Sequence, residues 1–188
     1  MEAIVDACHS GRLPAEPVLV LSDVADSGIL QRAREKNIPE RHIAPGPFKT
    51  KLSEESERTF IDCLNEARVD WVILAGFMRI IKSDFLRAFP ERIVNIHPSL
   101  LPSFPGLNAA AQAIEYGVQV SGTTVHLVDQ GIDSGAIIAQ APVSIAADDT
   151  SERLHERIKQ VEHRLYPQAI SDLVTGRIKV QGRRILRP

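Results

Sequence analysis

Trp71-Val72-Ile73-Leu74-Ala75-Gly76 is a continuous apolar run that stops at a glycine, and it is the clearest strand signal in the chain. An unbroken apolar run of this length is typical of a strand whose two faces are both buried in a parallel sheet. An amphipathic helix is expected before it, over residues 53–68, and a second buried strand after it, Ile93-Val94-Asn95-Ile96-His97. Strands that alternate with helices in this way predict parallel βαβ units.

The alternation extends in both directions from this centre. Asn108 is the expected N-cap of one helix and Gly117 lies just past its end, and a long final helix should begin near Asp149, with Glu152 completing a capping box. The predicted architecture is an α/β, three-layer sandwich around a Rossmann-like, mostly parallel sheet, forming one domain over residues 1–188. The further elements are strands at 18–21, 41–44, 123–128 and 137–145 and helices at 29–36 and 108–116.

Composition restricts the classes of partner. The chain has 188 residues, and its 22 Lys and Arg against 24 Asp and Glu give a net charge of -2. Nothing in that balance calls for a polyanionic partner such as a nucleic acid, and no apolar run approaches the roughly 20 residues that span a membrane. Cys8 and Cys63 are far apart and match no metal-binding spacing, which is typical of reduced thiols in the cytoplasm. The sequence leaves a homodimer open.

Two polar clusters lie where strands are expected to end, the edge of an α/β sheet that binds ligands. Asn95 and His97 are two residues apart in an extended segment, so their side chains share a face and could both donate to one oxyanion. A histidine at a strand end is more often a structural hydrogen-bonding residue than a catalyst. Asp133, in the segment 129–135, either caps an ordinary turn or lies beside His97, and spacing alone does not choose between these readings.

Five motifs resemble those of one family. The run Asn95-Ile96-His97-Pro98-Ser99-Leu100-Leu101-Pro102-Ser103-Phe104-Pro105-Gly106 resembles the signature of folate-dependent formyltransferases. Gly122-Thr123-Thr124-Val125-His126 and Gly131-Ile132-Asp133-Ser134-Gly135 match the same family in order and spacing. Leu74–Ile80 and Glu162–Pro167 are similar to the glycinamide ribonucleotide branch. The resemblance runs from Met1 to about Gly176.

The resemblance implies a reaction and a catalytic triplet. It implies transfer of the formyl group of 10-formyltetrahydrofolate to the amine of 5-phosphoribosylglycinamide in de novo purine biosynthesis, with no metal. Asn95 and a protonated His97 would stabilise the oxyanion, and Asp133 would hold His97 charged and help to move a proton from the amine to the leaving nitrogen. His126 is expected to be structural rather than catalytic.

The same resemblance assigns binding residues. Lys159 and Glu162, one helical turn apart, would receive the amine substrate, and the alternative for this pair is a surface ion pair of little consequence. Without the family, residues 77–81 would be read as core. The reduced folate would contact Lys51, Phe77, Met78, Arg79, Ile80, Ile81, Asn95, Val128, Asp129, Gly131 and Asp133.

One departure from the family pattern concerns the N-terminus. Family members normally open with a central strand and a Ser-Gly-x-Gly-Ser-Asn loop whose backbone amides would hold the substrate phosphate. Neither stands before the first helix here, and we expect a sequence that starts too late rather than a shortened family member. The alternatives to transfer are a formyltetrahydrofolate hydrolase, in which water replaces the amine, and a non-catalytic folate-binding relative.

Overall fold

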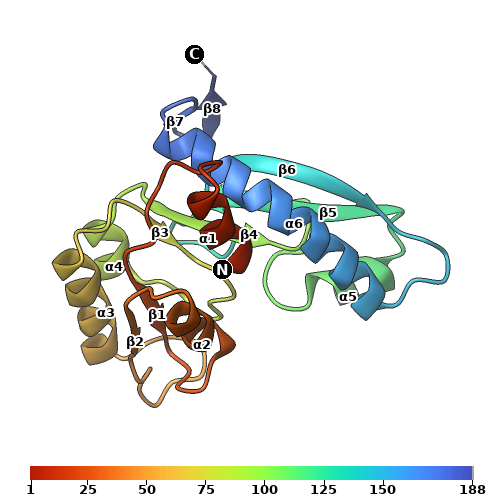
Figure 1. The fold of residues 1–188 in the computed structure, drawn as a ribbon. Coiled ribbons are helices and arrows are strands. Elements are labelled where there is room, and N and C mark those ends of the chain that lie inside the picture. The colour runs from red at the N-terminus through yellow and green to blue at the C-terminus, as the bar shows by residue number, and fades with distance from the viewer. Residues whose placement is uncertain (188) are drawn as a thin grey trace.

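The computed structural model describes residues 1–187 (Figure 1). The helices predicted at 29–36, 53–68 and 108–116, and the long helix predicted from near Asp149, are present to within a few residues, and the predicted strand 93–97 has the same bounds. The short helix at residues 83–88 was not predicted. In chain order the elements are α1 Glu2–His9, β1 Val20–Ser22, α2 Gly28–Glu35, β2 Glu40–His42, α3 Glu54–Glu66, β3 Val72–Ile73, α4 Ser83–Ala88, β4 Ile93–His97, α5 Ala109–Tyr116, β5 Val120–Leu127, β6 Ile137–Ser144, α6 Ser151–Val174, β7 Lys179–Gln181 and β8 Arg184–Leu186.

Within residues 1–187 the strands form three hydrogen-bonded sheets. β1 pairs with β2 and β3 with β4, both in parallel, as the alternation predicts. The order continues β4-β5-β6 with antiparallel pairing, and β7 and β8 form a separate antiparallel hairpin. The parallel prediction therefore holds for the pairs β1–β2 and β3–β4, whereas β5 pairs antiparallel with both β4 and β6. The connection from β5 to β6, residues 128–136, is too short for the crossover that parallel neighbours need.

Apolar side chains bury both faces of the sheet and so create three layers. Ile93 of β4 packs with Phe60, Leu64 and Phe85 from α3 and α4. The next residue, Val94, packs on the opposite side with α6, in a cluster that also holds Val125, Leu127, Tyr166 and Ile170. This alternation follows from the two-residue period of a strand. The three-layer α/β prediction is confirmed.

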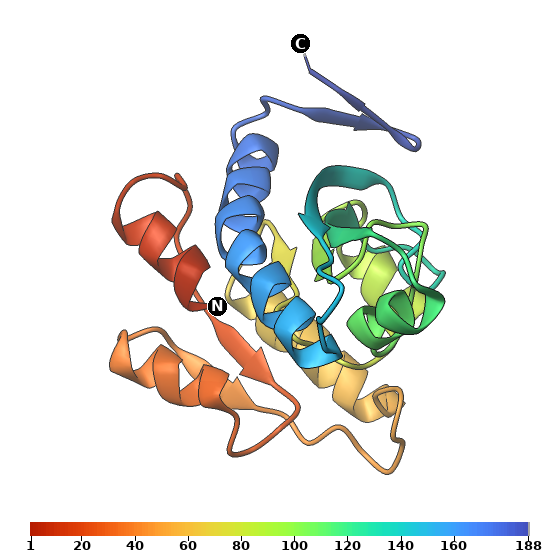
Figure 2. The same cartoon turned by 90° about the vertical axis from the view of Figure 1, so that its right-hand side faces the viewer.

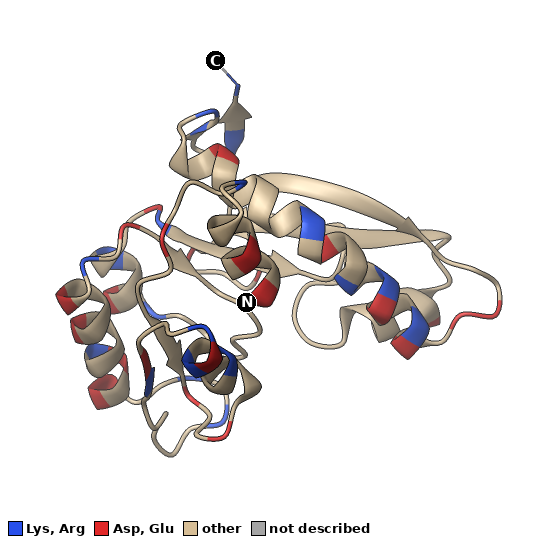
Figure 3. Ribbon diagram, in the orientation of Figure 1, with Lys and Arg blue, Asp and Glu red and all other residues tan. Residues whose placement is uncertain are grey.

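The charged residues follow the same layering (Figure 3). β4, β5 and β6 contain no Lys, Arg, Asp or Glu, whereas these residues recur along α3 and α6. In the view of Figure 2, α6 runs between the N-terminal elements α1, β1 and α2 on one side and the β5–β6 region on the other. No helix within the described residues is both long and apolar enough to cross a membrane.

Two predicted helix caps need correction. The capping box at Asp149 is wrong: α6 begins one residue later, and Thr150 accepts the Arg153 amide. Asp149 instead accepts from the Ala146 amide and pairs with Arg157. Gly117 ends α5 in a left-handed conformation, as predicted.

Asn108 is the N-cap of α5, as predicted, but it does not cap through its side chain. Its backbone is left-handed, with φ of 58°. Within residues 1–187, its side chain accepts no bond from the amides of α5.

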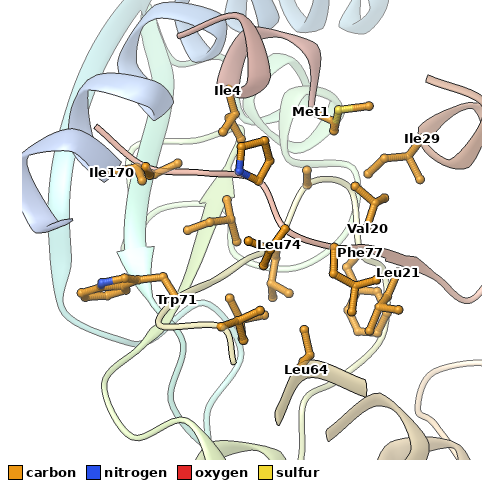
Figure 4. A pocket seen from close by; sticks show the side chains of 18 of the residues that line it. Met1, Ile4, Val20, Leu21, Ile29, Leu64, Trp71, Leu74, Phe77 and Ile170 are labelled. Atoms are coloured by element: carbon orange, nitrogen blue, oxygen red, sulfur yellow. The ribbon is translucent and has the colours of Figure 1, made fainter. Parts of the chain in front are cut away.

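A gap separates β1 from β3 (Figure 4). Within residues 1–187 no strand pairing joins the two sheets, and a cavity of about 870 Å³ lies between them. Side chains from both edges and from α6 surround it, among them Val20, Leu74 and Ile170. β3 is only Val72–Ile73, shorter than the predicted 71–76, and this edge of β3 faces the cavity instead of a neighbouring strand.

Candidate active site

A second cavity, of about 660 Å³, opens where β3 and β4 end and where the segment after β5 folds back. Its size is within the usual range for sites that bind small organic molecules. Eleven of the predicted site residues line it, which brings together segments far apart in the sequence. They are Phe77, Met78, Arg79, Ile80, Ile81, Asn95, His97, Val128, Asp129, Gly131 and Asp133.

β4 presents Asn95 and His97 on the side of the sheet that faces this cavity. The antiparallel register places His126 of β5 directly opposite Asn95, and the Asn95 Nδ2 atom lies 3.4 Å from His126 Nε2. His126 Nδ1 lies 2.8 Å from the Leu127 carbonyl oxygen, so Nδ1 carries the proton and Nε2 is left to accept from Asn95. Burial lowers the pKa of His126, which favours this neutral form.

Asp133 lies beside His97, the arrangement that its functional interpretation requires, and it also accepts a backbone amide. Its Oδ2 atom is 3.3 Å from His97 Nδ1 and accepts the Gly106 amide at 2.8 Å. Its Oδ1 atom is 3.6 Å from His126 Nε2. Asp133 has φ of 48°, a backbone conformation uncommon for a residue with a side chain. The surrounding contacts therefore hold this carboxylate in place.

Both ring nitrogens of His97 face oxygen acceptors. Nδ1 faces the Asp133 carboxylate, and Nε2 lies 2.8 Å from the Phe104 carbonyl oxygen. A protonated Nε2 therefore donates to the Phe104 carbonyl, while the Asp133 carboxylate faces the other ring nitrogen. His97 is only 5% exposed, so these contacts lie largely away from water.

The segment 129–135 is held by its own side chains. Asp129 Oδ1 accepts the Gly131 amide at 3.0 Å and the Ser134 hydroxyl at 2.6 Å, so this oxygen is already occupied by the turn. A Cβ on Gly135 would lie 1.8 Å from the Leu127 carbonyl oxygen. Glycine is therefore needed where this segment returns against β5.

Two predicted binding side chains are not where the prediction needs them. Lys51 is exposed, its Nζ lies 4.5 Å from the centre of the Phe48 ring, and the neighbouring Thr50 lines the cavity instead. Lys159 pairs with Glu156, its Nζ lying 2.8 Å from Oε1, and it does not line the cavity. Both side chains can move because they are solvent-facing, so these assignments stay predictions.

Glu162 lies behind β4 rather than in the cavity wall. The Thr123 hydroxyl is 3.2 Å from Glu162 Oε1 and 3.1 Å from the His97 carbonyl oxygen, which connects α6 to the end of β4. Burial raises the pKa of Glu162, and the contact with Thr123 opposes this shift. Burial of this carboxyl group therefore favours its neutral form.

Several residues of the cavity wall were not predicted from the sequence. Leu107 and Ile132 are exposed apolar side chains at the mouth of the cavity, and His155 in the first turns of α6 also lines it. Leu107 and Ile132 each follow a glycine in a loop, and this was the signal available for them. His155 carried no such signal, because only the packing of α6 brings it to the cavity. Across residues 1–187, no three His, Cys, Asp or Glu side chains gather closely enough to hold a metal ion.

The chain is similar to known formyltransferases over most of its length. The family model described as formyl transferase matches residues 1–170. Phosphoribosylglycinamide formyltransferase of Haemophilus influenzae is 39% identical over 181 residues, which are 96% of this chain and 84% of that protein. Glycinamide ribonucleotide transformylase 1 from Symbiobacterium toebii has a TM-score of 0.93 at 45% identity, covering 98% of this chain and 86% of that one.

A relative with a different printed activity is also similar. The formyltetrahydrofolate deformylase of Pseudomonas syringae pv. tomato has a TM-score of 0.91 at 25% identity, covering 99% of this chain and 61% of that one. Proteins with this fold are therefore named for more than one reaction. Because the family model matches residues 1–170, the chain belongs to the formyl transferase family.

Proposed function

We propose that this protein transfers the formyl group of 10-formyltetrahydrofolate to the amine of 5-phosphoribosylglycinamide, a step of de novo purine biosynthesis. The observation that carries the proposal is the convergence of Asn95, His97 and Asp133 at one wall of a cavity large enough for a reduced folate. The family match and the names of the Haemophilus influenzae and Symbiobacterium toebii relatives support the choice of substrates.

Asn95 and His97 act on the oxygen of the formyl group. As the amine nitrogen bonds to the formyl carbon, that oxygen becomes an oxyanion. The Nε2–H of His97, which donates to the neutral Phe104 carbonyl in the free protein, turns to the charged oxygen because an anion is the better acceptor. Asn95 donates its second amide hydrogen, while His126 fixes the first. Both interactions strengthen only as charge develops, which is what accelerates a reaction.

Asp133 orients His97 and takes part in the proton transfer. Its Oδ2 atom holds Nδ1 of His97, and its position at the cavity wall lets a water molecule connect it to the reacting nitrogens. The attacking amine loses a proton, the bond between the formyl carbon and N10 breaks, and the proton ends on N10. General acid–base help of this kind contributes about 10²–10⁴ in rate.

Different residues are proposed to bind the two substrates. The segment 77–81, with Val128, Asp129 and Gly131, forms the folate side, where backbone groups and apolar side chains can enclose a flat ring. Glu162 is proposed to receive the amine substrate, with Lys159 nearby on the same face of α6. The proposed partners are these small molecules, and the proposed reaction uses no metal. We place the protein in the cytoplasm, with residues 1–188 forming one domain.

Hydrolysis is the second candidate, because the deformylase of Pseudomonas syringae shares the fold. The identity of 45% to the Symbiobacterium toebii transformylase against 25% to the deformylase favours transfer to an amine. Discrimination between these acceptors depends on whether the cavity presents an amine or water to the formyl carbon, so the same triplet serves both.

One assay distinguishes three functions: formyl transfer to the amine, hydrolysis, and folate binding without a reaction. Loss of 10-formyltetrahydrofolate is followed with and without glycinamide ribonucleotide, the latter raised to several millimolar, in the wild type and in His97→Asn and Asp133→Asn. We expect amine-dependent turnover, reduced about 10²–10³-fold in each variant. The exposed Asp62→Asn serves as the control. Amine-independent release of formate would favour the hydrolase, and binding of tetrahydrofolate without turnover would favour a non-catalytic protein.

A further inference from the structure

The guanidinium of Arg79 joins three segments that follow β1, β2 and β3. Its Nε donates to Asp23 Oδ2 at 2.5 Å, and both side chains are only 15% exposed. Its Nη1 donates to the carbonyl oxygens of Phe48 and Lys49 at 2.6 and 3.1 Å and lies 3.4 Å from that of Lys51. One side chain therefore connects the end of β1, the loop 48–51 and the folate-side wall.

Backbone contacts continue this connection on the cavity side. The Ile80 amide donates to the Thr50 carbonyl at 2.9 Å, and Lys51 and Ile80 form an isolated parallel bridge. Thr50 and Ile80 both line the folate-side cavity, as does Arg79. The position of this wall is therefore tied to the loop 48–51, whose side chains otherwise face solvent.

The contacts match the chemistry of arginine. A guanidinium has donors in a fixed planar fork, so it can hold a carboxylate with one nitrogen and backbone carbonyls with another. A lysine ammonium is a point charge on a flexible stem and cannot reproduce both directions. The charge of Arg79 is balanced by Asp23, and carbonyl oxygens fill the remaining directions of Nη1.

We propose that Arg79 is a positioning residue: with Asp23 as its counter-ion, it fastens the loop 48–51 against residues 77–81 and so fixes the wall on which the folate lies. This differs from the direct folate contact that the sequence suggested for Arg79. Asp23 also lines the cavity between β1 and β3, so the two cavities share this ion pair at their rims. The part of the proposal that concerns folate rests on the proposed function, whereas the fastening of the loop does not.

Limited proteolysis measures the fastening without any substrate. Lys49 and Lys51 are exposed, so trypsin can cleave after them once the loop leaves the wall. In Arg79→Met we expect cleavage after these two lysines to be about 10-fold faster, because charge-assisted hydrogen bonds are lost. Asp23→Asn should give a smaller increase, and the double variant should be no worse than Arg79→Met, as expected for one shared interaction. Arg87→Met removes an exposed pair with Asp84 and should leave both cleavage rates unchanged.

Kinetics then distinguish positioning from direct binding. A loosened wall should raise KM for 10-formyltetrahydrofolate about 10-fold in Arg79→Met while kcat changes less than about 3-fold, and Arg79→Lys should lie between the variant and the wild type. Tetrahydrofolate should protect both lysines from trypsin in the wild type. A raised KM with wild-type cleavage rates and a silent Asp23→Asn would overturn the proposal in favour of direct contact, and unchanged cleavage and KM would overturn it outright.

The two proposals fail in different ways. Faster cleavage in Arg79→Met with no protection by tetrahydrofolate would support the fastening and contradict the proposed function. If Arg79→Met does not fold, Asp23→Asn and Arg79→Lys carry the test, and wild-type cleavage in both would overturn the proposal.

Discussion

Tyr166→Phe should destabilise the protein through one hydroxyl group. Tyr166 lies on α6 and is 5% exposed, and its hydroxyl lies 2.8 Å from the Leu74 carbonyl oxygen and 2.9 Å from that of Val94. Burial, and then the charge of Glu162, hold the pKa of Tyr166 well above its usual value, so the hydroxyl remains a donor. It connects α6 to the residues that follow β3 and to β4, where the site is built.

The expected loss of stability depends on which hydrogen bonds each of the two carbonyl oxygens keeps after the substitution. Val94 retains the bond from the Leu74 amide at 2.9 Å, whereas the Leu74 carbonyl loses its hydroxyl donor at the edge of the cavity between β1 and β3. Leaving a buried acceptor unpaired costs roughly 1–3 kcal/mol, and water in the cavity can offset part of this. We expect the free energy of unfolding to fall by about 1–2 kcal/mol, or roughly 2–8 °C in Tm for a chain of this size.

Urea unfolding followed by circular dichroism measures this loss. The matched control is Tyr116→Phe, because Tyr116 is 79% exposed and packs its ring against Phe104. Its free energy of unfolding should stay within about 0.5 kcal/mol of the wild type. Equal midpoints for the two variants would refute the reasoning, since the buried hydroxyl would then contribute no more than a solvated one.

Three further predictions concern the core and the pH dependence of stability. Leu154→Ala removes a fully buried side chain of α6 and should cost about 2–5 kcal/mol by urea unfolding. Arg157 and then the Ala146 amide lower the pKa of Asp149 to about 2. Its contribution to the free energy of unfolding is therefore complete above about pH 4 and is lost as the pH falls toward 2. An acid titration of Asp149→Asn should show a correspondingly smaller loss of stability over this range. Burial lowers the pKa of His126, so as the pH falls the unfolded chain takes up a proton before the folded one, and stability should fall below about pH 6.5. His126→Asn should reduce the difference in the free energy of unfolding between pH 7 and pH 5. The control His42→Asn, at an exposed position, should not reduce it.

The sequence predicts those parts of the fold whose signal is local. The run 93–97 is a strand with the predicted bounds, and Gly117 ends its helix as glycine permits. The capping box at Asp149 failed because Arg157, two turns further along α6, competes for the same carboxylate. β3 ends early because a strand's length depends on its neighbours, and the Leu74 carbonyl bonds to a side chain 92 residues away.

The candidate site shows the same limit at the level of side chains. Their spacing predicts that Asn95 and His97 share one face, and they do so in the structure. Spacing could not predict that Asp133 lies 3.3 Å from His97. That proximity was expected only from the resemblance to the family. Arg79 was expected at the folate, and it lines the cavity as predicted. Its binding partners are Asp23 and three carbonyl groups, which no pattern within the run 74–80 could indicate.

The cavity between β1 and β3 leaves β1 and β2 outside the hydrogen-bonded sheet that β3–β6 form. Within residues 1–187, the strand pairing of β1 and β2 therefore joins them only to each other. A unit that few backbone hydrogen bonds tie to the rest of a protein can open locally without global unfolding. Amide hydrogen exchange should therefore be faster in β1 and β2 than in β4 and β5, each of which pairs with a strand on both sides.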